Sequence, residues 1–265
     1  MRHLLVLAIM GIILMVPAMG QESSELQQPQ IEAHNLRVTL NPELHTIGAA
    51  DSIRLTELVD DEFKFTLNRN LVVESLTISS GTPVEWTLEP YEDEGTSEEE
   101  VTETFQWVVV TFPTEIQEFE IVYSGEIYDP IDPSSALGRV RGDYTTGIIS
   151  EEGVYLSSGS GWYPDTEYSM AMYNVMVTVP EDWSAVTQGS ISFQHESTPF
   201  RIMSWDCDGV PSDGCVLVAN EYHVRSREID GVTCSTYFYQ DDEELSNQFL
   251  DKLEEYLPAY QDLFG

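Results

Sequence analysis

Positive charge is scarce in this chain. Its 265 residues contain 11 Lys and Arg against 47 Asp and Glu, which gives a formal net charge of −36. Lys64 and Lys252 are the only lysines, and residues 70–138 contain no base. Affinity for phosphates and for anionic lipid head groups is built from Lys and Arg, so nucleic acid and anionic membrane surfaces are excluded as default partners. Proteins, peptides, sugars and cations remain.

The acidic composition is not that of a disordered tail. Hydrophobic residues make up 42% of the chain and aromatic residues 11%, which is enough apolar area for a folded core. An acidic surface stays hydrated at high salt, where its self-repulsion is screened, so a saline habitat is a reasonable hypothesis. A calcium-binding surface is the alternative, but the regular D-x-D-x-D-G loop is missing. The acidic runs 92–94 and 98–100 around Gly95 predict a solvated hairpin loop.

Long hydrophobic runs are missing after residue 20. Residues 1–20 have the parts of a secretory signal peptide: a polar start, an apolar core from Leu4 to Val16, and the small-x-small site Ala18-Met19-Gly20. The core is shorter than the ~20 residues that span a bilayer, and an uncleaved anchor remains the alternative. We therefore expect an exported protein, periplasmic or extracellular, with no membrane association beyond the signal peptide.

Cysteine is also rare, with three residues in the chain. In an oxidising compartment, Cys207 and Cys215 bracket a loop rich in Pro, Gly and Asp, and this arrangement favours a disulfide between them. Cys234 would then be an unpaired residue buried in a strand. A zinc site is the alternative, but the spacing matches no C-x-x-C pattern and no histidine lies close.

Catalytic motifs are absent as well. The chain has no H-E-x-x-H, G-x-S-x-G, P-loop or dinucleotide fingerprint, and His195-Glu196 is followed by Pro199, which forbids the helix of a zinc motif. Carboxylate pairs occur by chance among so many acids and carry no argument. His34 and His45 flank the first strand and are interpreted as polar groups at its edges. The sequence therefore predicts no catalytic and no metal-binding residue.

What is present is a strand pattern. From His34 onward apolar residues alternate with polar ones, as in Leu36, Val38 and Leu40, and turn residues recur at short intervals. No amphipathic helix is evident between residues 34 and 220. We expect residues 21–33 to form a linker and residues 34–225 an antiparallel, saddle-like β sandwich, so that the fold is mainly β.

The pattern changes near the C-terminus. Residues 232–239 predict one more strand, and residues 241–265 predict a helix that Asp241 and Glu244 cap and that Pro258 kinks or interrupts. Its apolar residues follow the spacing of one helix face: Leu245, Phe249, Leu253, Tyr256, Leu257, Tyr260 and Phe264. A lone strand and helix make a poor domain. Residues 226–265 are therefore interpreted as the start of a truncated second domain.

One loop is the candidate binding segment: Ser157, Ser158, Gly159, Ser160, Gly161 and Trp162, followed by Tyr163 and Pro164. Small residues before a rigid aromatic pair suit recognition through backbone groups, because glycine lets a ligand approach closely. The alternative is a strand crossover that its aromatic residues pack into the core.

Several segments resemble, in order and spacing, the N-terminal region of the alanyl-aminopeptidase-like family of gluzincin zinc metallopeptidases. The resemblance covers most of the mature chain. Its segments are the strand from His34 to Leu40, the turn 45–51, the strand 119–125 ending in Tyr-x-Gly, Gly153-Val154-Tyr155 before Trp162-Tyr163-Pro164, the segment 177–189, and the helix from Tyr256 to Gly265.

The resemblance implies a β saddle followed by the first strand and helix of a truncated, thermolysin-like α/β catalytic domain. In that family, G-A-M-E-N, H-E-x-x-H and a later Glu lie beyond the position that matches Gly265. Zinc is therefore expected only for the missing catalytic domain, and this chain alone is expected to bind none and to be inactive. The implied partners are that catalytic domain and, for the full-length protein, a peptide substrate.

The chain departs from the family at the candidate loop. Family members place a Gln or Glu shortly before an Arg-x-x-Phe-Pro segment, near the free amine of the substrate. Residues 157–161 contain no Gln, Glu or Arg, which argues against strict aminopeptidase specificity, although the loop can still line the cleft through its backbone and Trp162. Two non-catalytic functions stay open: a secreted peptide- or protein-binding β module on a peptidase-like scaffold, and an acidic adhesin-like sandwich.

Overall fold

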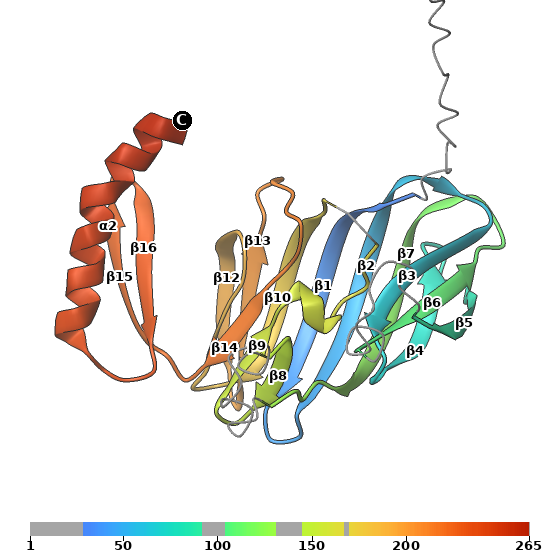
Figure 1. Cartoon of the computed structure of the whole chain (residues 1–265), viewed down its shortest axis with the longest axis horizontal. Coiled ribbons are helices and arrows are strands. Elements are labelled where there is room, and N and C mark those ends of the chain that lie inside the picture. Colours follow the sequence, from blue (N-terminus) through green and yellow to red (C-terminus); the bar gives the residue numbers. More distant parts are fainter. Residues whose placement is uncertain (1–28, 92–103, 131–144, 167–169, 265) are drawn as a thin grey trace, which may run out of the picture.

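The computed structural model describes residues 29–91, 104–130, 145–166 and 170–264. Within these ranges the chain forms four sheets and a long C-terminal helix, so the predicted mainly β fold is confirmed (Figure 1). The predicted signal peptide and the acidic runs 92–94 and 98–100 lie outside the described residues. Among the described residues, no helix combines the length and the apolar character that a membrane crossing requires.

The largest sheet has seven strands in the order β12-β13-β10-β1-β2-β7-β4. They are β1 (Ile31–Asn41), β2 (Thr46–Val59), β4 (Leu71–Ile78), β7 (Ile116–Glu126), β10 (Met172–Pro180), β12 (Ser190–Ser197) and β13 (Phe200–Asp206). The pairing of β1 with β10 is parallel, and the other pairings are antiparallel. β1 starts at Ile31, inside the segment expected to be a linker, because Ile31 is itself buried.

Two smaller sheets cover the inner face of the large one. The first contains β3 (Glu62–Asn68), β6 (Phe105–Thr111) and β5 (Glu85–Pro90), and the second contains β11 (Ser184–Val186), β14 (Leu217–Asn220), β9 (Gly153–Leu156) and β8 (Gly147–Ser150). Alternate residues of the three sheets form one continuous core. In it Phe65 of β3 stacks on Phe119 of β7, with their ring centroids 6.1 Å apart.

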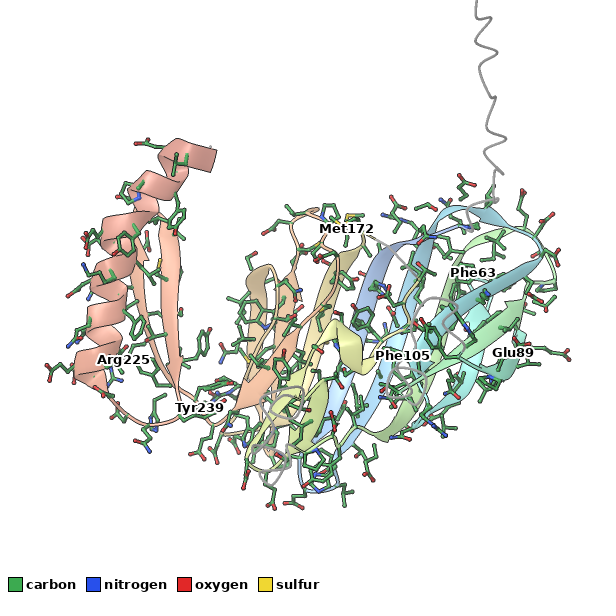
Figure 2. The ribbon with its side chains drawn as sticks, viewed as in Figure 1. Phe63, Glu89, Phe105, Met172, Arg225 and Tyr239 are labelled. Atoms are coloured by element: carbon green, nitrogen blue, oxygen red, sulfur yellow. The ribbon has the colours of Figure 1, made fainter. Side chains whose placement is uncertain are left out.

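A hairpin and a helix form a separate C-terminal unit, which Arg225 and Tyr239 mark in Figure 2. The hairpin pairs β15 (His223–Ile229) with β16 (Val232–Phe238), whereas the sequence pattern predicted one strand here. Asp230 and Gly231 both have positive φ, at 49° and 81°, as in a tight hairpin turn. The predicted domain boundary at residue 226 therefore falls inside β15. The charged residues of β15 interrupt the alternation of polar and apolar residues by which a strand is identified in a sequence.

The helix α2 (Glu243–Phe264) continues through Pro258. Its first turn is capped by Asp242, whose carboxylate accepts a hydrogen bond from the Leu245 N–H at 2.9 Å, so the predicted cap at Asp241 is wrong by one residue. Asp241 instead forms an ion pair with Arg225, in which the Arg225 Nη2–H donates a hydrogen bond to the Asp241 carboxylate at 2.7 Å. This hydrogen bond lowers the pKa of the Asp241 carboxyl.

The hairpin covers one flank of the apolar helix face. Ser246 and Leu250 are buried there, and the Ser246 hydroxyl lies 2.6 Å from that of Thr236. The other flank of the face remains exposed: Leu245, Phe249, Leu253, Tyr256 and Tyr260. The predicted helix face therefore exists, but this unit buries only part of it.

The expected disulfide is not formed, since Cys207, Cys215 and Cys234 are all free thiols. Cys207 follows the end of β13 in the large sheet, whereas Cys215 precedes β14 in the four-stranded sheet. The Cys215 sulfur lies 3.3 Å from the Thr187 hydroxyl, and burial raises the pKa of this thiol to about 12. The loop between the two residues thus joins two sheets instead of closing on itself.

We expect the Cys215 thiol to resist alkylation in the folded chain, because the thiolate is the reactive form and burial disfavours it. Titration with a thiol-specific disulfide reagent should give three thiols per chain after unfolding without reductant. A titre of one thiol would contradict the free-thiol assignment and would restore the disulfide.

Candidate functional site

The candidate loop follows β9 and contains a short 3-10 turn over Ser158–Ser160. Gly159 is exposed, Ser157 and Ser158 are half-buried, and Ser160, Gly161 and Trp162 are buried. The Ser157 hydroxyl donates to the Thr146 carbonyl at 2.7 Å, and the Ser160 hydroxyl donates to the Ser157 carbonyl at 2.8 Å. The loop is therefore tied internally, and Ser158 and Gly159 are the part that can meet a ligand.

Trp162 does not line a surface. Its side chain is fully buried, and its Nε1–H donates to the Cys215 carbonyl at 3.2 Å. Its own carbonyl accepts a hydrogen bond from the Tyr123 hydroxyl at 3.0 Å. The prediction that Trp162 borders a cleft is wrong, and the aromatic pair instead packs the crossover, as the alternative interpretation had it.

Gly161 is needed for contact within the chain. Its φ is 63°, and a Cβ atom added there would lie 2.8 Å from the Phe105 ring and 2.9 Å from the Asn68 nitrogen. The Asn68 N–H donates to the Gly161 carbonyl at 2.9 Å, and the Asn68 side-chain amide donates to the Ser160 carbonyl at 2.7 Å. The close approach that the glycine permits is therefore that of β3.

A buried histidine–aspartate pair lies beside this crossover. His34 Nδ1 and Asp51 Oδ2 are 2.6 Å apart, and both side chains are completely buried. The His34 ring stacks on Tyr173 with centroids 4.9 Å apart and meets the edge of Tyr163 at 5.3 Å. The interpretation of His34 as a group at a strand edge is wrong, because β10 pairs with β1 on its far side and places β1 inside the sheet.

The sequence held a signal for this pair. Asp51 shares the parity of Ala49 and Ile53, and His34 shares that of Leu36 and Val38, so alternation alone places both on the inner face. His45 was likewise taken as an edge group, but it is half-buried, and its Nδ1 lies 2.7 Å from the Ile149 carbonyl.

The cluster around His34 is sealed rather than catalytic. Burial raises the pKa of the Tyr123, Tyr163 and Tyr173 hydroxyls above their ordinary value, which keeps them protonated. The Tyr163 hydroxyl accepts a hydrogen bond from the Cys215 N–H at 3.0 Å. A histidine–aspartate pair can orient a general base, but here no atom of the pair reaches a surface where a substrate could lie. Its role is to join β1, β2 and β10.

The described ranges contain no group of three or more His, Cys, Asp or Glu side chains placed to hold a metal ion. The residues described do not fit a zinc centre of the kind that the family resemblance implies. Any catalytic zinc would have to be bound by residues outside those described.

The fold matches solved zinc metallopeptidases. A variant of the M1 zinc metallopeptidase from Deinococcus radiodurans, bound to a Tyr-Ser-Ala substrate, aligns with a TM-score of 0.57 at 17% identity, over 83% of this chain and 52% of that one. The unmodified enzyme gives 0.54 at 17% identity, over 87% and 54%. A two-domain M1 zinc metallopeptidase variant bound to L-arginine gives 0.52 at 18% identity, over 79% and 47%.

No protein-family model matches the chain, and no curated protein sequence matches it significantly.

We expect replacement of Asp51 by Ala to lower the free energy of unfolding by about 3–5 kcal/mol, because it leaves His34 buried without its partner. Glu57→Ala removes a carboxylate from an exposed position of the same strand and should change the stability by less than about 0.5 kcal/mol. Urea titration followed by tryptophan fluorescence measures both. Equal effects of the two substitutions would contradict the structural role of the pair.

The chain spans about half the length of the solved structures that it matches, and it has the fold of the N-terminal portion of M1 zinc metallopeptidases.

Proposed function

We propose that this chain is the N-terminal part of an exported, zinc-dependent, aminopeptidase-like metallopeptidase that acts on peptides. The likeness in fold supports this function, together with the coverage of about half of each matched chain. Zinc would supply Lewis-acid polarisation of the scissile carbonyl and activation of water. The residues described here would support and border that site rather than hold the metal.

The observation that carries the proposal is the exposed flank of α2. Five large apolar residues of α2 are exposed to solvent on this flank. On the neighbouring flank, the hairpin buries Ser246 and Leu250. An amphipathic helix normally buries a stripe of this width against a domain core. The occupant we propose is the catalytic domain of the same protein, since β15, β16 and α2 would then form its first elements.

The candidate loop would contribute to the substrate cleft through its backbone. Gly159 and the Ser158 hydroxyl are available, but no residue from 157 to 162 titrates. Such a loop can accept and donate hydrogen bonds to a peptide backbone, but it cannot bind the free amine of a substrate through a carboxylate. We therefore propose a peptidase that requires a free N-terminus on its substrate less strictly than an aminopeptidase does.

We expect the purified chain of 265 residues to retain less than 0.1 zinc per chain after dialysis and to leave alanyl-p-nitroanilide intact. The product of the complete reading frame should retain about one zinc and hydrolyse the anilide. Metal analysis and absorbance at fixed protein concentration measure both. Stoichiometric zinc or hydrolysis with the 265-residue chain alone would contradict the proposal.

We expect Tyr256→Glu to reduce self-association of the isolated chain, because it places a charge in the middle of the exposed apolar flank. Gln248→Glu adds the same charge to an exposed polar position outside this apolar flank, about 80° around α2 from Tyr256, and is the matched control. In the complete protein, Tyr256→Glu should lower the yield of active enzyme several-fold, whereas Gln248→Glu should not. Light scattering after gel filtration and activity per zinc measure these effects. If both variants behave like the unmodified chain, the flank is not an interdomain surface.

A further inference from the structure

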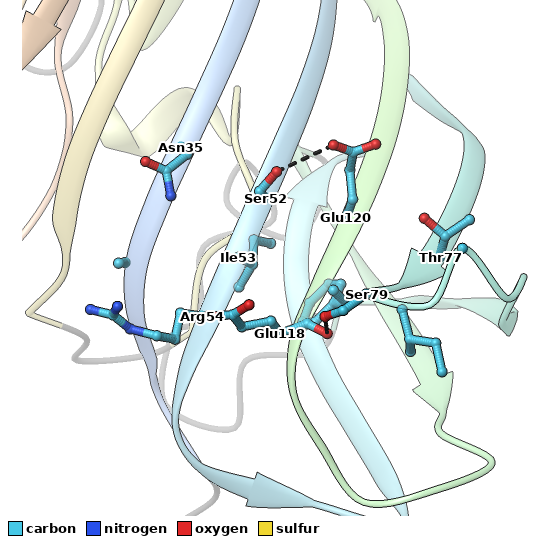
Figure 3. A pocket seen from close by; sticks show the side chains of 12 residues that line it. Asn35, Ser52, Ile53, Arg54, Thr77, Ser79, Glu118 and Glu120 are labelled. Atoms are coloured by element: carbon cyan, nitrogen blue, oxygen red, sulfur yellow. Dashed lines mark hydrogen bonds between the residues drawn. The ribbon is translucent and has the colours of Figure 1, made fainter.

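The outer face of the large sheet carries a polar groove, far in sequence from the candidate loop. Its volume is about 400 Å³, and it crosses β1, β2, β7 and β4 (Figure 3). Its lining includes the small residues Ala33 and Ser52, together with Ser79 and Gly81 of the turn after β4. We call this feature the outer groove.

The polar side chains of the outer groove form a row. Strand register aligns Asn35 of β1, Ser52 of β2, Glu120 of β7 and Thr77 of β4 at one level of the sheet. The Ser52 hydroxyl donates to the Glu120 carboxylate at 3.2 Å, and Arg37 donates to the same carboxylate at 2.7 Å. These contacts fix the positions of the side chains before any ligand arrives, which lowers the entropic cost of binding.

Hydrogen-bonding capacity is left over beside this row. Arg54 and Glu118 are register partners on adjacent strands, and Figure 3 shows them as neighbours. Arg54 nevertheless directs its Nε–H to Glu32 at 2.8 Å, and among the described residues no ion pair joins it to Glu118. The Glu118 carboxylate accepts no hydrogen bond within the described chain. A donor and an acceptor thus stand side by side in the lining of the outer groove.

The charge balance of the outer groove selects the ligand chemistry. Arg37 and Arg54 nearly offset Glu32, Glu118 and Glu120, so this region has about one net negative charge in a chain that carries −36. The field of the whole chain opposes carboxylates and phosphates. Alternating donors and acceptors with little net charge match hydroxyl groups, because each hydroxyl donates one hydrogen bond and accepts others.

We propose that the outer groove binds a neutral, polyhydroxylated ligand, namely a carbohydrate chain. Asn35 and Arg54 would donate to sugar hydroxyls, and Glu118 and Glu120 would accept from them. The one aromatic residue of the groove, Phe119, is buried, so binding would rest on hydrogen bonds without ring stacking. This site does not depend on the proposed peptidase function, since it lies on the face opposite to the core.

The test is titration of the isotope-labelled 265-residue chain, followed by amide NMR. The ligands are hexaoses of glucose, N-acetylglucosamine, mannose and xylose and, in separate titrations, alanyl-alanine and inorganic phosphate. We expect at least one hexaose to give saturable shifts confined to β1, β2, β7 and β4. Glu118→Gln should weaken that binding about tenfold, because it removes a charged acceptor. Glu126→Gln, on the same strand and face but outside the outer groove, should leave the affinity unchanged.

Three results would overturn the proposal. The first is no shift with any hexaose at millimolar concentration, and the second is shifts that map elsewhere or that Glu126→Gln weakens as much as Glu118→Gln. The third is binding of alanyl-alanine or inorganic phosphate, but of no hexaose, in this groove, which would assign it to a charged ligand.

Discussion

One short crossover, residues 160–162, is hydrogen-bonded to all three sheets that share the core. The Trp162 carbonyl accepts a hydrogen bond from the hydroxyl of Tyr123 in the large sheet. The Trp162 indole N–H donates to the carbonyl of Cys215, beside the four-stranded sheet. Gly161 and Ser160 accept hydrogen bonds from Asn68 of the three-stranded sheet. Buried polar groups need such partners, so this segment cannot turn outward to meet a ligand without leaving several of them unsatisfied.

Apart from the exposed turn at Ser158 and Gly159, two surfaces of the described chain are open to a partner or a ligand. One is the exposed flank of α2, which has the chemistry of a domain interface, and the other is the outer groove, which has that of a polar ligand site. The core itself holds a histidine, an aspartate and three tyrosines, but their burial makes them structural. Titratable residue types alone would have suggested a catalytic centre in that place.

Sequence reasoning recovers the periodic features and misses those that depend on neighbours. Alternation from Leu36 to Leu40 identifies a strand, and the apolar spacing identifies α2, because both patterns repeat along the chain. Whether β1 is central or at an edge depends on β10, which lies over 130 residues away in sequence, so the burial of His34 required the sheet order. The predicted disulfide between Cys207 and Cys215 was wrong for the same reason, since the loop between the two residues joins different sheets.

The candidate loop shows the same limit on a smaller scale. Glycine beside aromatic residues indicates a close approach of backbone, but the pattern does not say whether the approaching backbone belongs to a ligand or to β3. The exposed flank of α2 was visible in the sequence only as an apolar face. The hairpin of β15 and β16 covers the other flank, and charged residues hid β15 in the sequence pattern.

The central claim is that the chain is the N-terminal part of a zinc metallopeptidase. The most direct measurement is the sequence of the coding DNA downstream of codon 265. The account predicts an open reading frame that continues into G-A-M-E-N and H-E-x-x-H followed by a later Glu. A stop codon directly after Gly265 in an intact gene would contradict it, and would favour a non-catalytic binding module on a peptidase-like scaffold.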